Sequence, residues 1–220
     1  MRSFMQKYKH GWIFSYTLIY LPWFYYLEQH VTHKFHVIHT PLDDVIPFME
    51  IFIIPYYLWF VFMAVTVLYF FFTNKTEFYQ LMIFLIIGMT LFLIISTVFP
   101  NGQLLRPTTF ERDNIFVDMV KQLYRTDTCT NIFPSIHVYN SIGVAVSILK
   151  SEQLQKYRKI RIGAVILAIT IILSTLFLKQ HSVLDALSAG LLSIISYRLV
   201  YVTEPRKANS LSSCPQSSTL

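Results

Sequence analysis

The stretch HSVLDALSAGLLSIISYRLV, residues 181–200, joins a histidine and an aspartate to a long apolar run. His181 and Asp185 are four residues apart, so on a helix they share one face, where the carboxylate can hold one ring nitrogen and leave the other free. An ionisable side chain deep in a membrane helix costs about 2.5 kcal/mol or more, so Asp185 needs a partner or a chemical role. The spacing predicts an oriented histidine at the start of a membrane span.

The whole chain is unusually apolar. Of its 220 residues, 54% are hydrophobic and only 14% are charged, and the mean hydropathy is +0.49. A typical soluble domain has about 25% charged residues, and about 20 mostly apolar residues cross a bilayer. We therefore predict an all-α membrane protein, a bundle of six transmembrane helices at residues 12–27, 51–72, 78–98, 135–149, 162–178 and 183–202.

The predicted membrane domain covers residues 1–205. The first apolar stretch is rich in aromatic residues and lacks a small-x-small cleavage site, so we expect it to be retained as a span. Residues 206–220 are rich in serine and predict a disordered tail. In the last span, Ala186 and Gly190 are four residues apart and predict a close contact with a neighbouring helix.

The net charge is +6, and the basic residues gather on one predicted side of the membrane. Lysine and arginine gather at the N-terminus, at 150–161 and near the end of the chain, and six spans put all three regions on one side. The positive-inside rule then places both termini in the cytoplasm, in a multi-pass protein expected in the plasma membrane. This distribution favours the bilayer as partner over nucleic acid. Cys129 and Cys214 fall on opposite sides, so no disulfide is expected.

The other side receives the connections 28–50, 100–134 and 179–181, and with them most of the reactive side chains. Residues 110–124 of the long middle connection predict a short helix on the membrane surface. The first connection holds histidines at every third position, which spread around a helix instead of converging, so an interfacial segment is favoured over a metal site; they are His30, His33, His36 and His39. Asp43 and Asp44 predict a turn or helix start, with a contact to the active site as the alternative.

Three segments together resemble the type 2 phosphatidic acid phosphatase superfamily, whose members have the vanadium haloperoxidase fold. They are Arg106-Pro107, Pro134-Ser135-Ile136-His137, and the stretch from Lys179 to Asp185. The family's second motif is Pro-Ser-Gly-His, with Ile136 here in place of glycine. Its third motif has a histidine followed four residues later by aspartate, which His181 and Asp185 match.

Two positions depart from the family pattern. Phe99 stands where the first motif has lysine, and Thr175 stands where the third motif has arginine. Such losses are similar to the inositol phosphorylceramide synthase-like branch and, more distantly, to sphingomyelin synthases. The resemblance covers the last four predicted spans well and the first two only by general pattern.

The residues themselves predict phosphoryl transfer. Ser135 opens an apolar helix whose N-terminal end attracts anions, and Arg106 can clamp two phosphate oxygens, with Lys179 supplying a further charge. His181, oriented by Asp185, is the expected nucleophile, and His137 the expected general acid and base. No metal or cofactor is required by this set.

We therefore expect a phosphatase that acts on a lipid phosphate ester through a phosphohistidine. The same residues also serve a lipid phosphotransferase, if an alcohol replaces water as acceptor. A non-catalytic lipid-phosphate binder or transporter is the third hypothesis, which the missing motif lysine and arginine favour and the retained histidines oppose.

Overall fold

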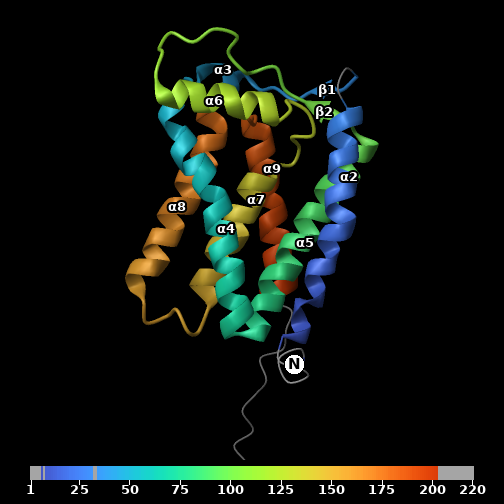
Figure 1. The fold of residues 1–220 in the computed structure, drawn as a ribbon, viewed down its shortest axis with the longest axis vertical. Coiled ribbons are helices and arrows are strands. Elements are labelled where there is room, and N and C mark those ends of the chain that lie inside the picture. The colour runs from blue at the N-terminus through green and yellow to red at the C-terminus, as the bar shows by residue number, and fades with distance from the viewer. Residues whose placement is uncertain (1–5, 7, 32–33, 203–220) are drawn as a thin grey trace, which may run out of the picture.

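The structure, a computed structural model, describes residues 6, 8–31 and 34–202 of the chain. Its long helices lie roughly along one axis, and consecutive ones run in opposite directions (Figure 1). They are α2 (Thr17–His30), α4 (Ile53–Thr73), α5 (Lys75–Val98), α7 (Ile136–Lys150), α8 (Arg158–Phe177) and α9 (Val183–Tyr197). Because the helices alternate, the three connections that the sequence placed on one side do lie at the same end of the bundle.

Short elements form a cap over that end (Figure 1). The cap consists of β1 (His36–Val37), α3 (Pro41–Val45), η2 (Glu50–Phe52), β2 (Asn101–Gly102), α6 (Ile115–Thr126) and the loops between them. At the other end, a 3-10 helix, η1 (Lys9–Tyr16), precedes α2, and a π-helical turn, η3 (Arg198–Val202), follows α9. The predicted tail at 206–220 and Cys214 lie outside the described residues, and Cys129 is a free thiol.

The predicted count of six spans is not confirmed. Among the described residues, four helical segments are long and apolar enough to cross a membrane: Glu50–Thr73, Lys75–Val98, Arg158–Phe177 and Val183–Val202. They correspond to the second, third, fifth and sixth predicted spans. The first and fourth predicted spans are not among them. Helix α7 has 15 residues, and at 1.5 Å per residue it reaches about 22 Å, less than the roughly 30 Å of a hydrocarbon core. Helix α2 has 14 residues, but η1 continues directly into it, so the helical segment runs from Lys9 to His30.

Helix α7 lies at the centre of the bundle, against α4, α5, α8 and α9. Its contact with α5 depends on two glycines that leave room for aromatic rings: Gly88 faces Tyr139, and Gly143 faces Phe84. The two rings stack with their centroids 4.7 Å apart, and the Tyr139 hydroxyl donates to the carbonyl of Phe84 at 2.8 Å. This close approach fixes the position of α7, whose first turn carries His137.

The prediction that Ala186 and Gly190 form a close helix contact is wrong. A Cβ built on Gly190 would meet no atom within 4 Å, and both residues line an open apolar groove beside α7. Gly190 therefore faces open space, whereas Ala186 packs against the buried cluster that includes Val138 and Tyr139 of α7.

Helix α6 lies across the ends of the long helices (Figure 1). It is amphipathic: Val117, Val120 and Leu123 are buried, whereas Asp118 and Arg125 are exposed. The Asn114 side chain caps its start by accepting from the backbone N–H groups of Phe116 and Val117, both at 3.0 Å. The surface helix predicted at 110–124 is therefore present, a few residues later than expected.

The two short strands connect the cap loops. β1 and β2 are parallel, with His36 opposite Asn101, and the Asn101 side chain accepts from the backbone N–H groups of Ile132 and Phe133, both at 2.9 Å. These bonds hold the loop that leads into α7. The fold thus carries the N-terminal ends of α7 and α9 to one place beneath the cap.

The described histidines of the first connection point to different partners. His30 stacks on Tyr26, His36 stacks on Phe99, and His39 pairs with Asp44 at 2.9 Å. His33 lies outside the described residues. Within the part of the chain that the structure describes, no group of three or more histidine, cysteine or carboxylate side chains could hold a metal ion.

Replacing Gly88 with alanine tests the α5–α7 contact. The new Cβ would lie 2.0 Å from the Tyr139 ring, so the ring must leave its stack on Phe84. Overpacking of this kind costs about 1–3 kcal/mol, and we expect a clearly lower melting temperature in detergent. The control is Gly163→Ala, which meets nothing within 4 Å and should leave stability equal or higher, because alanine favours a helix over glycine. Equal losses in both variants would contradict the close approach.

Candidate active site

Helices α7 and α9 begin side by side, and their first residues bring the two predicted histidines together. The backbone N–H of Ser135 donates to the carbonyl of Asp185 at 3.3 Å. His137 Nδ1 and His181 Nε2 are 3.5 Å apart, although the residues are 44 positions apart in the chain. Two imidazoles at this distance can act on one small group bound beside them.

His181 lies in a turn, residues 178–183, between α8 and α9. Lys179 has a φ of 53°, in the left-handed region, and the backbone N–H groups of Gln180 and His181 both donate to the carbonyl of Thr175. Thr175, which stands where the resembled family has arginine, therefore contributes its backbone and no charge here. The imidazole of His181 itself is 7% exposed.

Asp185 has two contacts at the start of α9. Its Oδ2 lies 3.5 Å from His181 Nδ1, and the same oxygen accepts from the backbone N–H of Ser182 at 2.8 Å. The carboxylate is fully buried. It can therefore orient the imidazole and stabilise its positive charge, while it also caps the helix.

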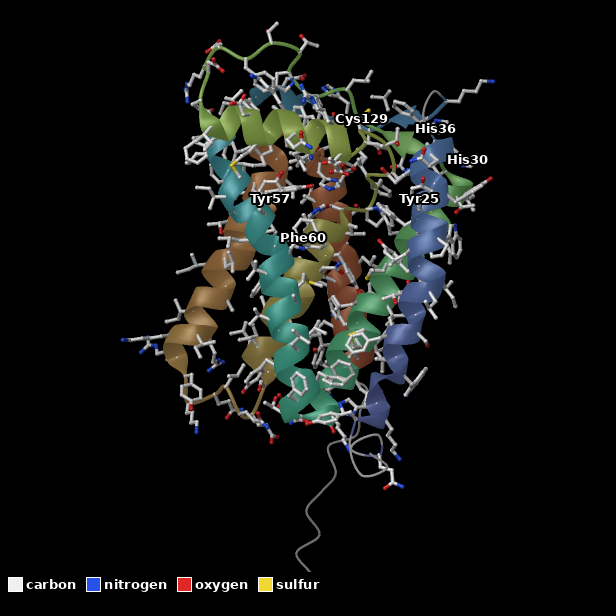
Figure 2. All side chains as sticks on the ribbon, in the orientation of Figure 1. Tyr25, His30, His36, Tyr57, Phe60 and Cys129 are labelled. Carbon is white, nitrogen blue, oxygen red and sulfur yellow. The ribbon has the colours of Figure 1, made fainter. Side chains whose placement is uncertain are left out.

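His137 is enclosed by aromatic rings of α4. The ring centroids of Tyr56 and Trp59 lie 4.8 Å and 4.5 Å from its own. Ser135 precedes it as the N-cap of α7, with Oγ accepting from the backbone N–H of Val138 at 3.3 Å. In Figure 2, Tyr57 and Phe60 of α4 and Tyr25 and His30 of α2 lie on opposite sides of the region where α7 and α9 begin.

Both histidines line a cavity of about 50 Å³. One part of its wall is apolar, formed by Phe24, Phe92, Ile132 and Ile136. The rest is polar, formed by Glu28, Asp127, Thr128, Thr130, Asn131, His137, Gln180 and His181. A single water occupies at least about 10–15 Å³ by such a measure, so the cavity has room for a few waters or one small polar group.

Two carboxyl groups in this wall were missed by the sequence analysis. Glu28, near the end of α2, accepts from Thr128 Oγ1 at 2.6 Å and from Asn131 Nδ2 at 3.0 Å. Asp127, just after α6, accepts from the Tyr56 hydroxyl at 3.2 Å and from Gln180 Nε2 at 3.1 Å. Glu28 carried a usable signal, since an ionisable residue at the edge of an apolar stretch often marks a site. Asp127 carried none in its own neighbourhood.

Arg106 reaches the site through Gln180. Its Nη1 donates to the carbonyl of Asp127 at 2.8 Å, and its Nη2 donates to the carbonyl of Thr128 at 2.7 Å and to Gln180 Oε1 at 2.5 Å. The guanidinium also lies 4.6 Å from the Tyr124 ring centroid. The guanidinium is thus bound to carbonyls at the end of α6 and to Gln180, the residue that precedes His181 in the chain.

The structure does not bring Lys179 to the cavity. Its Nζ donates to the carbonyls of Asp43 and Ile46, both at 2.5 Å, so the ammonium lies against α3, where backbone acceptors are available. Burial lowers the pKa of this ammonium, and the charges of Asp43 and Asp44 oppose that change. The lysine therefore anchors the turn that carries His181.

The Asp127 carboxyl gives a pH-dependent test. Burial raises its pKa, and the charges of Arg106 and His181 offset this only in part. Because the folded pKa lies above the unfolded value, the stability that Asp127 contributes is complete below the unfolded pKa and is lost as pH rises through the folded one. Asp127→Asn cannot ionise, so we expect it to melt higher than the wild type at pH 7, with a smaller difference at pH 4.

The matched control for this measurement is Asp113→Asn, which removes a carboxylate that is 93% exposed. It should change the melting temperature little at either pH. An Asp127→Asn variant that melts lower than the wild type at pH 7 would show that the attraction of Arg106 outweighs the cost of burial.

Comparison with known proteins shows that one part of the chain matches a protein family. Residues 101–208 match the sequence model of the PAP2 superfamily, which supports a phosphatase or phosphotransferase activity on phosphate esters in general. Comparisons with curated proteins and with solved structures gave no match. The matched segment includes every residue predicted for the site: Arg106, Ser135, His137, Lys179, His181 and Asp185. The part of the chain that carries the candidate active site is therefore similar to the PAP2 superfamily.

Proposed function

We propose that this chain is a membrane-embedded phosphatase that hydrolyses a lipid phosphate ester through a phosphohistidine on His181, without a metal ion. The observation that carries the proposal is the contact of 3.5 Å between the His137 and His181 rings, with Asp185 behind His181. Binding a phosphate needs positive charge, whereas an oriented pair of imidazoles suits nucleophilic attack and proton transfer. This favours an enzyme over a non-catalytic lipid-phosphate binder or transporter.

The reaction has two steps. In the first, His181 Nε2 attacks phosphorus, the bond from phosphorus to the leaving oxygen breaks, and His137 gives its proton to that oxygen. Asp185 stabilises the positive charge that develops on His181 through Nδ1. In the second, His137 takes the proton of the acceptor, whose oxygen attacks phosphorus, and the bond from phosphorus to nitrogen breaks to restore His181.

Charge on the phosphoryl oxygens needs donors around them. Ser135 places the N-terminal end of α7 beside His137, where backbone N–H groups and the helix dipole favour an anion. Arg106 adds its charge from behind Gln180, and direct contact with phosphate requires it to exchange that partner. Lys179 contributes its charge only from a distance, because its ammonium is bound at α3.

A lipid substrate agrees with the two-sided cavity. The histidines belong to the polar part of its wall, and the apolar part is formed by Phe24, Phe92, Ile132 and Ile136. A phosphate at the histidines would therefore have apolar groups next to it, as the headgroup of an amphiphile does.

The second candidate is a lipid phosphotransferase of the inositol phosphorylceramide synthase-like kind. The observation that favours it is the pair of carboxyl groups, Glu28 and Asp127, in the cavity wall. Carboxylates repel a doubly charged phosphate monoester more than a singly charged diester, and they accept hydrogen bonds from an alcohol. Incubation with lipid phosphates and phospholipids, with and without alcohol acceptors, distinguishes the two when free phosphate and new lipid are both quantified.

We propose that the cap faces the non-cytoplasmic side of the plasma membrane and that both termini are cytoplasmic. The support is the basic connection between α7 and α8, at the end opposite to the cap (Figure 1). Its lysine is Lys156, and it is flanked by Lys150 at the end of α7 and by Arg158, Lys159 and Arg161 at the start of α8. Basic residues concentrate in cytoplasmic connections.

Replacing His181 with alanine tests the covalent step. We expect loss of turnover with the fold retained, because no other imidazole in the cavity is oriented by Asp185. Substrate labelled in its phosphoryl group should give an acid-labile, alkali-stable adduct on the wild type and none on the variant. His39→Ala, in an exposed part of the cap, is the control and should label normally. Normal turnover by His181→Ala would remove His181 as the nucleophile.

Replacing His137 with alanine tests the proton transfer. A general acid contributes about 100- to 10,000-fold, so loss of His137 should slow lipid alcohol leaving groups by about that factor. An activated aryl phosphate should be slowed much less, because its oxygen leaves without protonation. The kcat/KM ratio of the two substrates measures the contrast. If both substrates slow equally, His137 binds phosphate or supports the structure instead.

A further inference from the structure

A strap of the cap, residues 40–46, lies against the 178–183 turn that carries His181. It consists of Thr40, the short helix α3 and Ile46. The turn reaches the strap through Lys179, whose Nζ donates to the carbonyls of Asp43 and Ile46. The strap precedes α4 in the chain, so the segment before the first of the four long apolar helices touches the segment before the last.

The Asp43 side chain binds the other side of the same turn. Its Oδ2 accepts from the Ser182 hydroxyl at 2.6 Å and its Oδ1 from the backbone N–H of Val183 at 2.7 Å. Within the strap, Oδ2 also accepts from the backbone N–H of Thr40 at 2.7 Å and from its hydroxyl at 3.1 Å. Asp43 is 2% exposed, and Ser182 lies 139 residues further along the chain.

These bonds complete the N-terminal end of α9. The first N–H groups of a helix have no partner inside it. Here Ser182 N–H donates to Asp185, Val183 N–H donates to Asp43, and Leu184 N–H donates to Ser182 Oγ at 3.2 Å. Asp43 is the member of this set that comes from a distant part of the chain, and its partners Ser182 and Val183 directly follow His181.

Asp43 is suited to stay charged in this position. Burial acts to raise the pKa of its carboxyl, but the hydrogen bonds from Ser182, Val183 and Thr40 outweigh burial and hold the pKa below its usual value. A carboxylate at the N-terminal end of a helix also gains from the helix dipole.

We propose that Asp43 is a positioning residue, which fixes the 178–183 turn so that His181 meets both Asp185 and the phosphoryl group; the proposal rests on the proposed function of His181. Without the Asp43 carboxylate, the Ser182 hydroxyl and the Val183 N–H lose their charged acceptor, and the turn keeps only its contacts through Lys179, the Thr175 carbonyl and Asp185. A misplacement of about 1 Å in a reacting group can cost about 100-fold in rate. Asp43 itself does not line the catalytic cavity.

The test compares Asp43→Asn with Asp44→Asn. Asp44 is the next residue of the strap, is 66% exposed and pairs with His39, so it is a matched control outside the site. We expect Asp43→Asn to lower kcat and the rate of His181 phosphorylation by about 10- to 100-fold, with KM changed about twofold or less. Asp44→Asn should match the wild type. Rates are normalised to the fraction of protein that becomes labelled, so partial misfolding does not imitate the effect.

Hydrogen exchange supplies a readout that is independent of turnover. Backbone amides of residues 178–186 should exchange faster in Asp43→Asn, whereas amides of α6 should not change. Asp43→Glu keeps the charge and should recover part of the lost kcat. Faster exchange with an unchanged kcat would overturn the positioning role, and so would unchanged exchange. A wild type that neither turns over nor labels at His181 would overturn the proposed function, and exchange alone would then report whether Asp43 anchors the turn.

Discussion

Two cationic side chains donate the hydrogen bonds that satisfy backbone carbonyl groups of the cap. Arg106 satisfies the carbonyls of Asp127 and Thr128 at the end of α6, and Lys179 satisfies those of Asp43 and Ile46 at α3. Buried carbonyls without a partner are costly, so these bonds set where the cap sits on the helices. Lys179 lies two residues before His181 in the chain, and Arg106 contacts Gln180, the residue between them. His181 is therefore held from two sides. The price of this arrangement is that neither ammonium nor guanidinium is free to face the cavity.

The sequence predicted the local part of the site because it depends on local geometry. A spacing of four residues is enough to bring His181 and Asp185 within 3.5 Å, and Pro134-Ser135 is enough to start a helix before His137. The alternation of helices then places both histidines at one end. The number of spans was not predictable in the same way, because apolar composition does not report that α7 has only 15 residues or that the first segment is a 3-10 helix before Thr17.

Contacts between distant segments could not be predicted. Glu28, Asp127 and Gln180 meet in one cavity from three separate regions of the chain, and no pattern in the sequence indicates that these three meet. The charges of Arg106 and Lys179 suggested that both bind phosphate. A sequence shows which hydrogen-bond donors exist, but it does not show which acceptors in the folded protein compete for them. The structure supplies those acceptors as carbonyls. Gly190 shows the same limit, since a small residue can face open space as well as a neighbouring helix.

An acidic wall and an anionic substrate are compatible if the wall is not fully ionised. Burial favours the neutral form of Asp127, and the charges of Arg106 and His181 favour the ionised form. In the proposed reaction, the negative charge of a bound phosphoryl group also favours the neutral form of Asp127, as burial does. The neutral carboxyl can donate a hydrogen bond to the phosphoryl oxygens instead of repelling them. A positive charge on His181 favours the ionised form of Asp127 again. The charge state of Asp127 is therefore coupled electrostatically to that of His181, the nucleophile of the proposed reaction.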